Sequence, residues 1–300
     1  MTGYYLPLLP PVLSSRFNPP ELSPVIDLSQ WNAAAEAVVG YRHRIDQQPC
    51  QDAALAKSAT RPHLVVSDGA GSAPVSELGS QVLVSGLSRL ITTVEPLFKT
   101  WLDEPVKDKA VTAEATELLA QLIARHAKGV LKDIAADHKR SEKDYRATLL
   151  VCVLGQYRSF WLQVGDGYLV IRNSDTQDKK TNRWKIISPP DKGEFANQTC
   201  FVDDRLSLGQ VQSGMLDSAG LTGVAAMSDG AAERLINLKN GEVANGLDHI
   251  SRWLEQDDQI EKSLYSFLCD PGIWNATTGD DKSLAVLAAS SAAQREEESR

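Results

Sequence analysis

Several residue patterns that mark common functional classes are absent from this sequence. The four cysteines are scattered without a CxxC pair, and the five histidines show neither HxxxH nor HExxH spacing, so we expect no zinc site. No run of about 18 apolar residues occurs, which argues against a transmembrane helix. Positive charge is also scarce, because the formal net charge is −8. We therefore expect neither nucleic acid nor an anionic membrane surface as a partner.

The composition is that of an ordinary soluble globular protein. Of the 300 residues, 42% are hydrophobic and 23% are charged, which suffices for one large domain or two small ones. Residues 1–30 are rich in proline and predict a surface arm, residues 31–290 a globular domain, and residues 291–300 a charged tail. Prolines interrupt the apolar segment Tyr4–Leu13, and no basic region precedes it. We therefore expect no secretion signal and a cytoplasmic protein.

Apolar periodicity predicts strands, then helices, then more strands. Strands are predicted at 31–44 and 62–67, followed by amphipathic helices at 76–102 and 112–139 that pack as an antiparallel pair. Further strands are predicted at 145–154, 157–164, 168–172, 184–188 and 223–228, with two short ones within 199–213. Helices at 231–238, 243–255 and 258–268 precede a last strand at 283–288. This order favours an α+β sandwich with helices packed on antiparallel sheets.

Four acidic turns lie next to these apolar strands. In the segment His63–Ser72, an apolar run stops at Asp68 and two glycines turn the chain toward a helix. The other three are Gln51-Asp52, Asp229-Gly230 and Asp280-Asp281. A single Asp-Gly pair at a strand end is usually an ordinary turn. If the four meet in space, they repel one another unless cations neutralise them, and ligation by oxygen alone suits Mg²⁺ or Mn²⁺.

A nucleotide-binding loop is the competing interpretation of Gly69-Ala70-Gly71, which follows a predicted strand and precedes a predicted helix. Pro74 stands where the third glycine of GxGxxG belongs, and no Gly-Lys-Ser/Thr occurs there. We therefore favour a metal site over a phosphate-binding loop. Two such ions about 4 Å apart activate a water and stabilise a phosphoryl transition state.

Six short elements occur in an order that is typical of one family. They are Cys50-Gln51-Asp52, Asp68-Gly69-Ala70-Gly71, Arg146–Leu150, Val164-Gly165-Asp166-Gly167, Ser228-Asp229-Gly230 and Asp280–Leu284. The second resembles the DGxGG element of the metal-dependent protein phosphatases, the protein phosphatase 2C-like family, and the chain is most similar to a divergent bacterial branch. The resemblance covers about residues 37–288. It implies a four-layer αββα sandwich, in which helix pairs flank two antiparallel sheets, with residues 31–290 as the catalytic domain.

The resemblance also implies a role for each acidic residue. Asp68 is expected to bridge two Mn²⁺ or Mg²⁺ ions, with Gly69 adding its backbone carbonyl to one of them. Asp229 and Asp280 are expected to bind the other ion, and Asp52 to help directly or through water. Asp166 matches the position of a third, weaker metal. A water or hydroxide that bridges the two ions would attack phosphoserine or phosphothreonine, so Asp68 and Asp52 are the predicted catalytic carboxylates.

The chain departs from the family pattern where phosphate is usually bound. Gln47 occupies the position of the phosphate-binding arginine. Arg42 or Arg44 is the candidate replacement, since a guanidinium binds phosphate through two hydrogen bonds, although both could equally be plain surface charges. His43 is a candidate general acid, with a structural histidine at the end of the predicted strand as the alternative.

The missing arginine keeps more than one function open. The leading hypothesis is a metal-dependent Ser/Thr protein phosphatase that acts as a monomer on a phosphorylated protein, with a cognate Ser/Thr kinase as a further candidate partner. The first alternative is a weak or inactive pseudophosphatase that binds a phosphoprotein or kinase as a regulator. The second is an enzyme of the same fold that acts on a small phosphorylated molecule.

Overall fold

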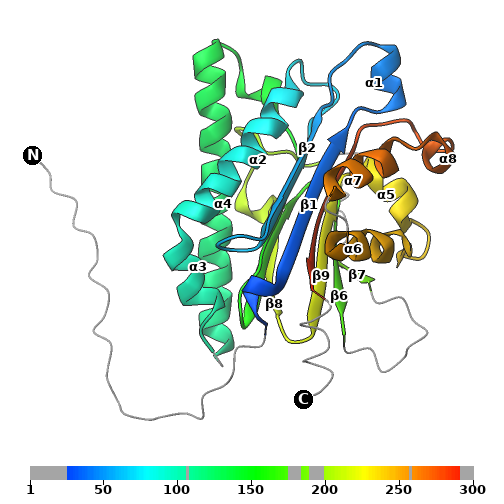
Figure 1. The fold of residues 1–300 in the computed structure, drawn as a ribbon. Coiled ribbons are helices and arrows are strands. Elements are labelled where there is room, and N and C mark those ends of the chain that lie inside the picture. The colour runs from blue at the N-terminus through cyan, green and yellow to red at the C-terminus, as the bar shows by residue number, and fades with distance from the viewer. Residues whose placement is uncertain (1–25, 106–107, 175–183, 189–198, 257–258, 291–300) are drawn as a thin grey trace, which may run out of the picture.

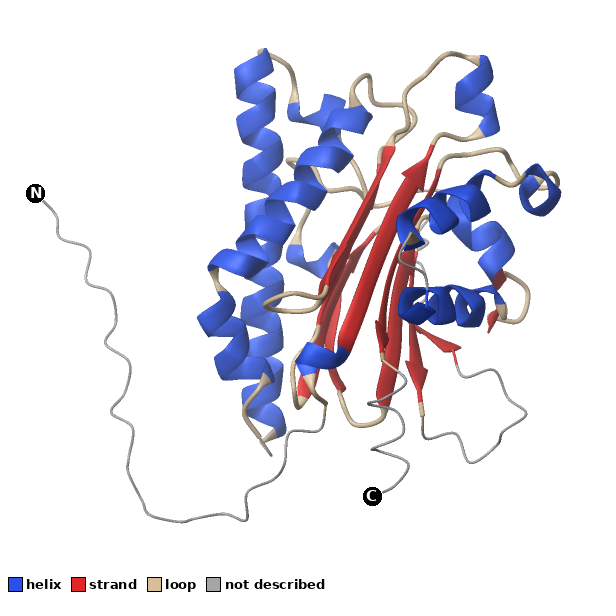
Figure 2. Ribbon diagram, viewed as in Figure 1, coloured by secondary structure: helices blue, strands red, loops and turns tan. Residues whose placement is uncertain are grey.

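The computed structural model describes residues 26–105, 108–174, 184–188, 199–256 and 259–290. Two five-stranded antiparallel sheets form the centre, and helices cover the outer face of each (Figures 1 and 2). One sheet has the strand order β1–β12–β9–β6–β7, and the other has the order β2–β3–β4–β5–β8. The predicted α+β class and the four-layer αββα sandwich are confirmed.

The first sheet consists of β1 (Trp31–Val38), β6 (Tyr168–Asn173), β7 (Trp184–Ser188), β9 (Leu221–Met227) and β12 (Lys282–Ala289). The second consists of β2 (Asp52–Lys57), β3 (His63–Asp68), β4 (Leu149–Val153), β5 (Arg158–Val164) and β8 (Gln212–Asp217). A small separate ribbon pairs β10 (Ile236–Asn237) with β11 (Glu242–Val243).

The helices divide between the two outer faces. The second sheet is covered by α2 (Ser76–Thr93), α3 (Glu95–Leu102) and α4 (Lys109–His138). The first sheet is covered by α5 (Asp229–Leu235), α6 (Gly246–Gln256) and α7 (Ile260–Cys269), with α8 (Pro271–Trp274) beside α7. The short helix α1 (Tyr41–Ile45) joins β1 to β2 and so links the two sheets. No helix in the described ranges is long and apolar enough to cross a membrane.

Alternation along β3 shows why its central residues, Leu64–Val66, are all apolar. Leu64 and Val66 belong to the core between the two sheets, whereas Val65 belongs to the core beneath α2 and α4. Both faces of the strand are therefore buried, which favours apolar residues at these three positions. Each strand of this kind is held rigidly, and the residues at its ends are held with it.

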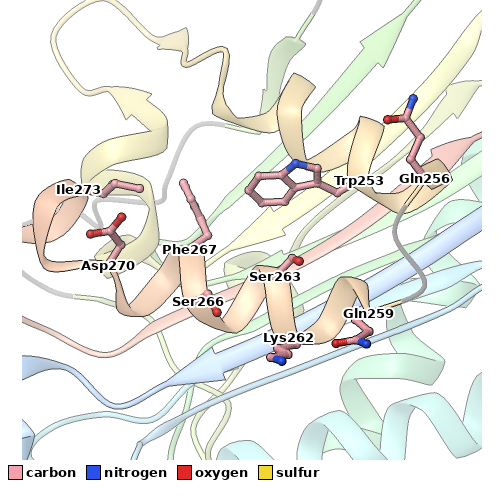
Figure 3. A pocket seen from close by; sticks show the side chains of 9 residues that line it. All are labelled: Trp253, Gln256, Gln259, Lys262, Ser263, Ser266, Phe267, Asp270 and Ile273. Carbon is pink, nitrogen blue, oxygen red and sulfur yellow. The ribbon is translucent and has the colours of Figure 1, made fainter.

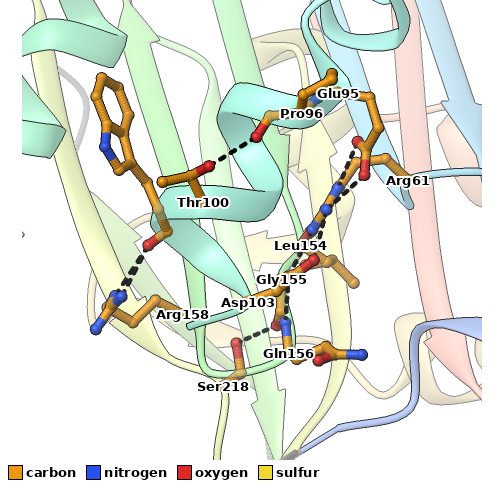
Figure 4. Close-up of polar contacts among 11 residues, drawn as sticks. Arg61, Glu95, Pro96, Thr100, Asp103, Leu154, Gly155, Gln156, Arg158 and Ser218 are labelled. Atoms are coloured by element: carbon orange, nitrogen blue, oxygen red, sulfur yellow. Dashed lines mark hydrogen bonds and ion pairs between the residues drawn. The ribbon is translucent and has the colours of Figure 1, made fainter. Parts of the chain in front are cut away.

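A buried arginine fastens α3 to the second sheet (Figure 4). Arg61 is 2% exposed, and its guanidinium donates to both carboxylate oxygens of Glu95 and of Asp103 and to the carbonyl of Leu154 at 2.7–2.9 Å. These contacts use all five N–H groups of the guanidinium, as a buried cation requires. The cluster anchors the β2–β3 turn to α3.

The sequence-based prediction is wrong at several boundaries. The strand predicted at 31–44 ends at Val38 and the chain then forms α1, while β2 was not predicted at all. The helix predicted at 76–102 divides at Val94, with Pro96 in the first turn of α3. A 3₁₀ helix, Glu142–Tyr145, precedes β4 where strand was expected, and only one strand, β8, begins within 199–213. Most of the predicted arm, the loops at 175–183 and 189–198 and the charged tail lie outside the described residues.

Candidate metal centre

Two of the predicted carboxylates are cross-strand neighbours. Asp52 is the first residue of β2 and Asp68 is the last residue of β3, and the two stand opposite each other in the antiparallel register. Asp229 begins α5 directly after β9, and Asp280 lies in the loop that leads into β12, the strand next to β9. Asp166 lies in the turn between β5 and β6. The predicted residues thus come from both sheets.

The electrostatics of Asp68 indicate that these carboxylates lie close together. Burial raises the pKa of Asp68 well above its usual range, and the negative charges of Asp52, Asp229, Asp166 and Asp280 raise it further. Coulomb interactions fall with distance, so all four partners must lie within interaction range of Asp68. The fold therefore brings together the five aspartates to which the family resemblance assigns metal binding.

The environment of Asp52 fits a cation. The residue is 4% exposed, and its Oδ2 has no hydrogen-bond partner among the described residues. Burial raises the pKa of Asp52 to about 7, whereas the hydroxyl of Ser228 opposes this shift. A buried carboxylate oxygen without a donor is costly unless a cation or a proton compensates it.

Asp229 has a similar electrostatic environment at the edge of the cluster. Its side chain reaches solvent, yet desolvation by the surrounding protein raises its pKa to about 6, and the charges of Asp166 and Asp280 add to the effect. Asp229 also lies in the first turn of α5, where the helix dipole favours a negative charge. Desolvation, together with repulsion from the neighbouring carboxylates, thus outweighs the stabilisation from the helix.

The turn after β3 is fixed by backbone contacts. The Asp68 N–H donates to Thr148 Oγ1 at 2.9 Å, and the Thr148 N–H donates to the Asp68 carbonyl at 2.8 Å. The Gly69 N–H donates to the Gln51 carbonyl at 3.0 Å. A Cβ at Gly69 would lie 2.8 Å from that carbonyl oxygen and from Ser76 Cβ, so only glycine fits. The backbone of Asp68 and Gly69 is therefore held between β2, α2 and the segment before β4.

The Asp280-Asp281 pair has two different functions. The Asp281 carboxylate is buried and accepts hydrogen bonds from the backbone N–H groups of Gly40 and Gln51, both at 2.6 Å. His43 Nδ1 lies 2.9 Å from Asp281 Oδ2. Asp280 is half-buried, and its charge acts on Asp68 and Asp229. Asp280 thus belongs to the carboxylate cluster, whereas Asp281 fastens the β1–β2 connection to it.

The basic residues predicted near the site all lie on α1. His43 faces Asp281, and the Nη2 of Arg44 lies 3.5 Å from Cys269 Sγ on α7. The side chain of Arg42 is exposed, whereas the backbone N–H of this residue donates to the Gly279 carbonyl at 3.0 Å. Among the described residues, no ion pair joins Arg42 or Arg44 to the five aspartates. Their assignment to phosphate, and that of His43 to proton transfer, stay predictions.

Metal ligation itself also stays a prediction. Within the described part of the chain, no group of three or more Asp, Glu, His and Cys side chains already has the arrangement of a formed metal site. A separate open hollow lies between α6, α7 and α8 (Figure 3). It is lined by Trp253, Phe267 and polar side chains. None of the five aspartates lines it, so it is distinct from the carboxylate cluster.

Comparison with known proteins identifies the class. Residues 39–269 match the family model described as protein phosphatase 2C. This is more than half of the chain, and the chain therefore belongs to the protein phosphatase 2C family and to its class of phosphoprotein hydrolases. The matched range contains Asp52, Asp68, Asp166 and Asp229 and ends before Asp280. No curated protein sequence matches the chain.

Solved structures of bacterial phosphatases share the fold. A Mycobacterium tuberculosis serine/threonine phosphatase, PstP/Ppp, has a TM-score of 0.55 at 13% identity, with 87% of this chain and 99% of that chain covered. The catalytic domain of PstP in complex with two manganese ions has a TM-score of 0.55 at 16% identity, with 87% and 98% covered. A serine/threonine phosphatase from Staphylococcus aureus has a TM-score of 0.51 at 14% identity, with 85% and 94% covered.

Proposed function

We propose that this chain hydrolyses phosphoserine and phosphothreonine in protein substrates with two Mn²⁺ or Mg²⁺ ions held by the aspartate cluster. The supporting observation is the cluster of five carboxylates, in which burial and neighbouring negative charges raise the pKa of Asp52, Asp68 and Asp229, and in which Asp52 Oδ2 has no donor among the described residues. Asp68, Asp52, Asp229 and Asp280 are the proposed ligands, with the Gly69 carbonyl, and Asp166 is proposed for a third, weaker ion. Hard divalent cations prefer such an all-oxygen set.

When bound, the two cations would polarise the phosphate and lower the pKa of a water that attacks phosphorus. The chain's own contribution is to hold the ligands. Asp68 is fixed by β3 and Thr148, and Asp280 is fixed by the neighbouring Asp281. Because Asp52 and Asp68 stand at the ends of paired strands and Asp280 is held by Asp281, the site would be preorganised for in-line displacement. A cognate Ser/Thr kinase, whose substrates this enzyme would dephosphorylate, is proposed as a functional partner.

The direct test combines metal binding with turnover. Calorimetric titration with Mn²⁺ should show binding to wild-type protein that is lost in Asp68→Asn. Hydrolysis of p-nitrophenyl phosphate and of a phosphothreonine peptide should require Mn²⁺ and stop on addition of EDTA. Asp137→Asn, an exposed carboxylate on α4, is the matched control and should behave as wild type. Folded protein that binds no Mn²⁺ would contradict the proposed site.

A regulator without turnover is the second candidate. It is favoured by Gln47 at the position of the family's phosphate-binding arginine and by the contact of Arg44 with Cys269. In that case Mn²⁺ would bind, and a phosphothreonine peptide would bind without being hydrolysed. Comparing rates on phosphopeptides with rates on small phosphorylated metabolites separates a protein phosphatase from an enzyme of small molecules.

A further inference from the structure

The helix α1 exposes large side chains beside the aspartate cluster. Tyr41 is 71% exposed and Ile45 is 62% exposed, and the two are four residues apart, so they share one face of the helix. Arg44, also exposed, lies between them on the same side. The helix contains no acidic residue, although Asp46 follows it directly. In a chain of net charge −8 this is a locally basic and apolar surface.

This helix is fastened to the loop that carries Asp280. A Cβ on Gly40 would lie only 2.2 Å from the backbone carbon of Asp280, so the two segments are in direct backbone contact. The Arg42 N–H donates to the Gly279 carbonyl at 3.0 Å, and Asp281 accepts from the Gly40 N–H at 2.6 Å. A Cβ added to Gly279 would lie 3.6 Å from the Cβ of Tyr41. The helix α1 is thus held in a fixed position against the loop that carries Asp280.

The same surface continues onto α7. Arg44 Nη2 lies 3.5 Å from Cys269 Sγ, and Tyr265, one turn before Cys269, is 50% exposed. A hydrogen bond with Cys269 raises the pKa of Tyr265, while the Arg44 cation lowers it, which confirms that the three side chains are neighbours. The charge of Glu36 also acts on Tyr265, so one carboxylate faces this end of the surface.

The composition of this surface is that of a protein-binding site. Exposed Tyr, Ile and Arg side chains gathered on one face are typical of interface anchors, whereas isolated exposed apolar residues carry no such meaning. The basic charge of Arg44 complements an acidic segment. Because α1 is in backbone contact with the loop that holds Asp280, residues that flank a phosphate bound at the aspartate cluster would lie near this helix.

We propose that Tyr41, Arg44, Ile45 and Tyr265 form a docking surface for the substrate polypeptide that flanks the phosphorylated residue. The surface selects substrates that carry an acidic and an apolar residue beside the phosphorylated residue on one side. This inference rests on the proposed phosphatase function. It adds the class of substrate, an acidic-apolar phosphosegment, which the aspartate cluster alone does not specify.

The test compares two phosphothreonine peptides, one with Glu and Leu on each side and one with Lys and Ser at the same positions. Wild type should prefer the first by about tenfold in kcat/KM, equivalent to about 1.4 kcal/mol. The double variant Tyr41→Ser/Ile45→Ser should lose most of this preference through a raised KM, with hydrolysis of p-nitrophenyl phosphate unchanged. Arg44→Glu should reverse the charge preference. Leu238→Ser, at a 60% exposed position on the β10–β11 ribbon, is the control and should change neither rate.

Equal use of both peptides by wild type would overturn the inference, as would an equal loss of activity on p-nitrophenyl phosphate in the double variant. If wild type hydrolyses neither substrate, the proposed function has failed instead. Fluorescence anisotropy of the two labelled peptides then decides whether the docking preference exists without turnover. If the double variant turns a dimer into a monomer in light scattering and keeps its peptide selectivity, the surface is a contact between two copies and the inference is wrong.

Discussion

Replacing Asp52 with asparagine should stabilise the metal-free protein at pH 8, although the change removes a proposed metal ligand. Asp52 is 4% exposed and its pKa is raised to about 7. Relative to the ordinary value of 3.8, this is about three pKa units, and one unit corresponds to about 1.36 kcal/mol. The ionised side chain therefore destabilises the metal-free fold by about 4 kcal/mol. Asparagine is neutral and avoids this cost.

The substitution also introduces a cost of its own. The amide NH₂ would take the place of Oδ2, which has no hydrogen-bond partner among the described residues. A buried donor without an acceptor costs about 1–3 kcal/mol. The net gain in the free energy of unfolding should thus be about 1–3 kcal/mol at pH 8.

The pH dependence follows from the sign of the shift. Below pH 3.8 the carboxyl is protonated in both folded and unfolded protein, so it contributes nothing to the pH dependence. Between pH 3.8 and about 7 the unfolded state releases the proton first, and wild type loses stability as the pH rises. Above about pH 7 the full penalty is present. The gap between Asp52→Asn and wild type should open over this range.

Urea denaturation in EDTA at pH 4.5, 6 and 8 measures this gap, with Asp137→Asn as the control that should follow wild type. Mn²⁺ at one hundred times its Kd should then add about 2.7 kcal/mol to wild type and less to the variant, which narrows the gap between them at pH 8. A variant that is less stable than wild type at pH 8 in EDTA would refute the reasoning. A gap that does not change with pH would refute it as well.

Three further substitutions test contacts outside the aspartate cluster. Arg61→Met leaves the carboxylates of Glu95 and Asp103 without their cation and should cost about 3–5 kcal/mol in urea denaturation; a loss below about 1 kcal/mol would contradict the importance of this cluster. Burial lowers the pKa of His63, so as the pH falls below about 6.5 the unfolded state takes up a proton first and wild type loses stability. The variant His63→Gln cannot take up this proton. It should therefore lose less stability than wild type between pH 7 and 5 in thermal melts. Asp281→Ala frees two backbone N–H groups and should weaken Mn²⁺ binding about tenfold or more in calorimetry; unchanged affinity would argue against its anchoring role.

Most of the fold could be predicted because both sheets are buried on both faces. The continuous apolar runs of β4, β9 and β12 arise from burial on each side, and the spacing in α2 and α4 arises from one packed face. The misses at α1 and β2 have a different origin. The helix α1 has no buried residue, and its position depends on Asp281, more than two hundred residues away in the chain. A local window of sequence cannot contain that contact.

The sequence predicted which aspartates lie together at the candidate site, but not the different contacts that each of them makes. Asp52, Asp68 and Asp229 each stand at the start or end of an apolar strand, and the resemblance to protein phosphatase 2C supplied their common purpose. Asp280 and Asp281 are chemically identical in the sequence. The structure separates them because the N–H groups of Gly40 and Gln51 face Asp281. The only local sequence signal for the anchoring role of Asp281 was the pair of adjacent aspartates, Asp280-Asp281.

Asp281 and Asp52 are both buried, and a comparison of the two shows how the fold tolerates a charge that the protein does not compensate. Asp281 receives two short hydrogen bonds from backbone N–H groups, so its buried charge is compensated by the protein. Asp52 is equally buried, but its Oδ2 has no donor within the part of the chain that the structure describes. Supplying that donor would stabilise the metal-free fold and at the same time remove the reason for a cation to bind. The metal-free instability that we expect at pH 8 is therefore the same free energy that binding of a divalent ion would recover.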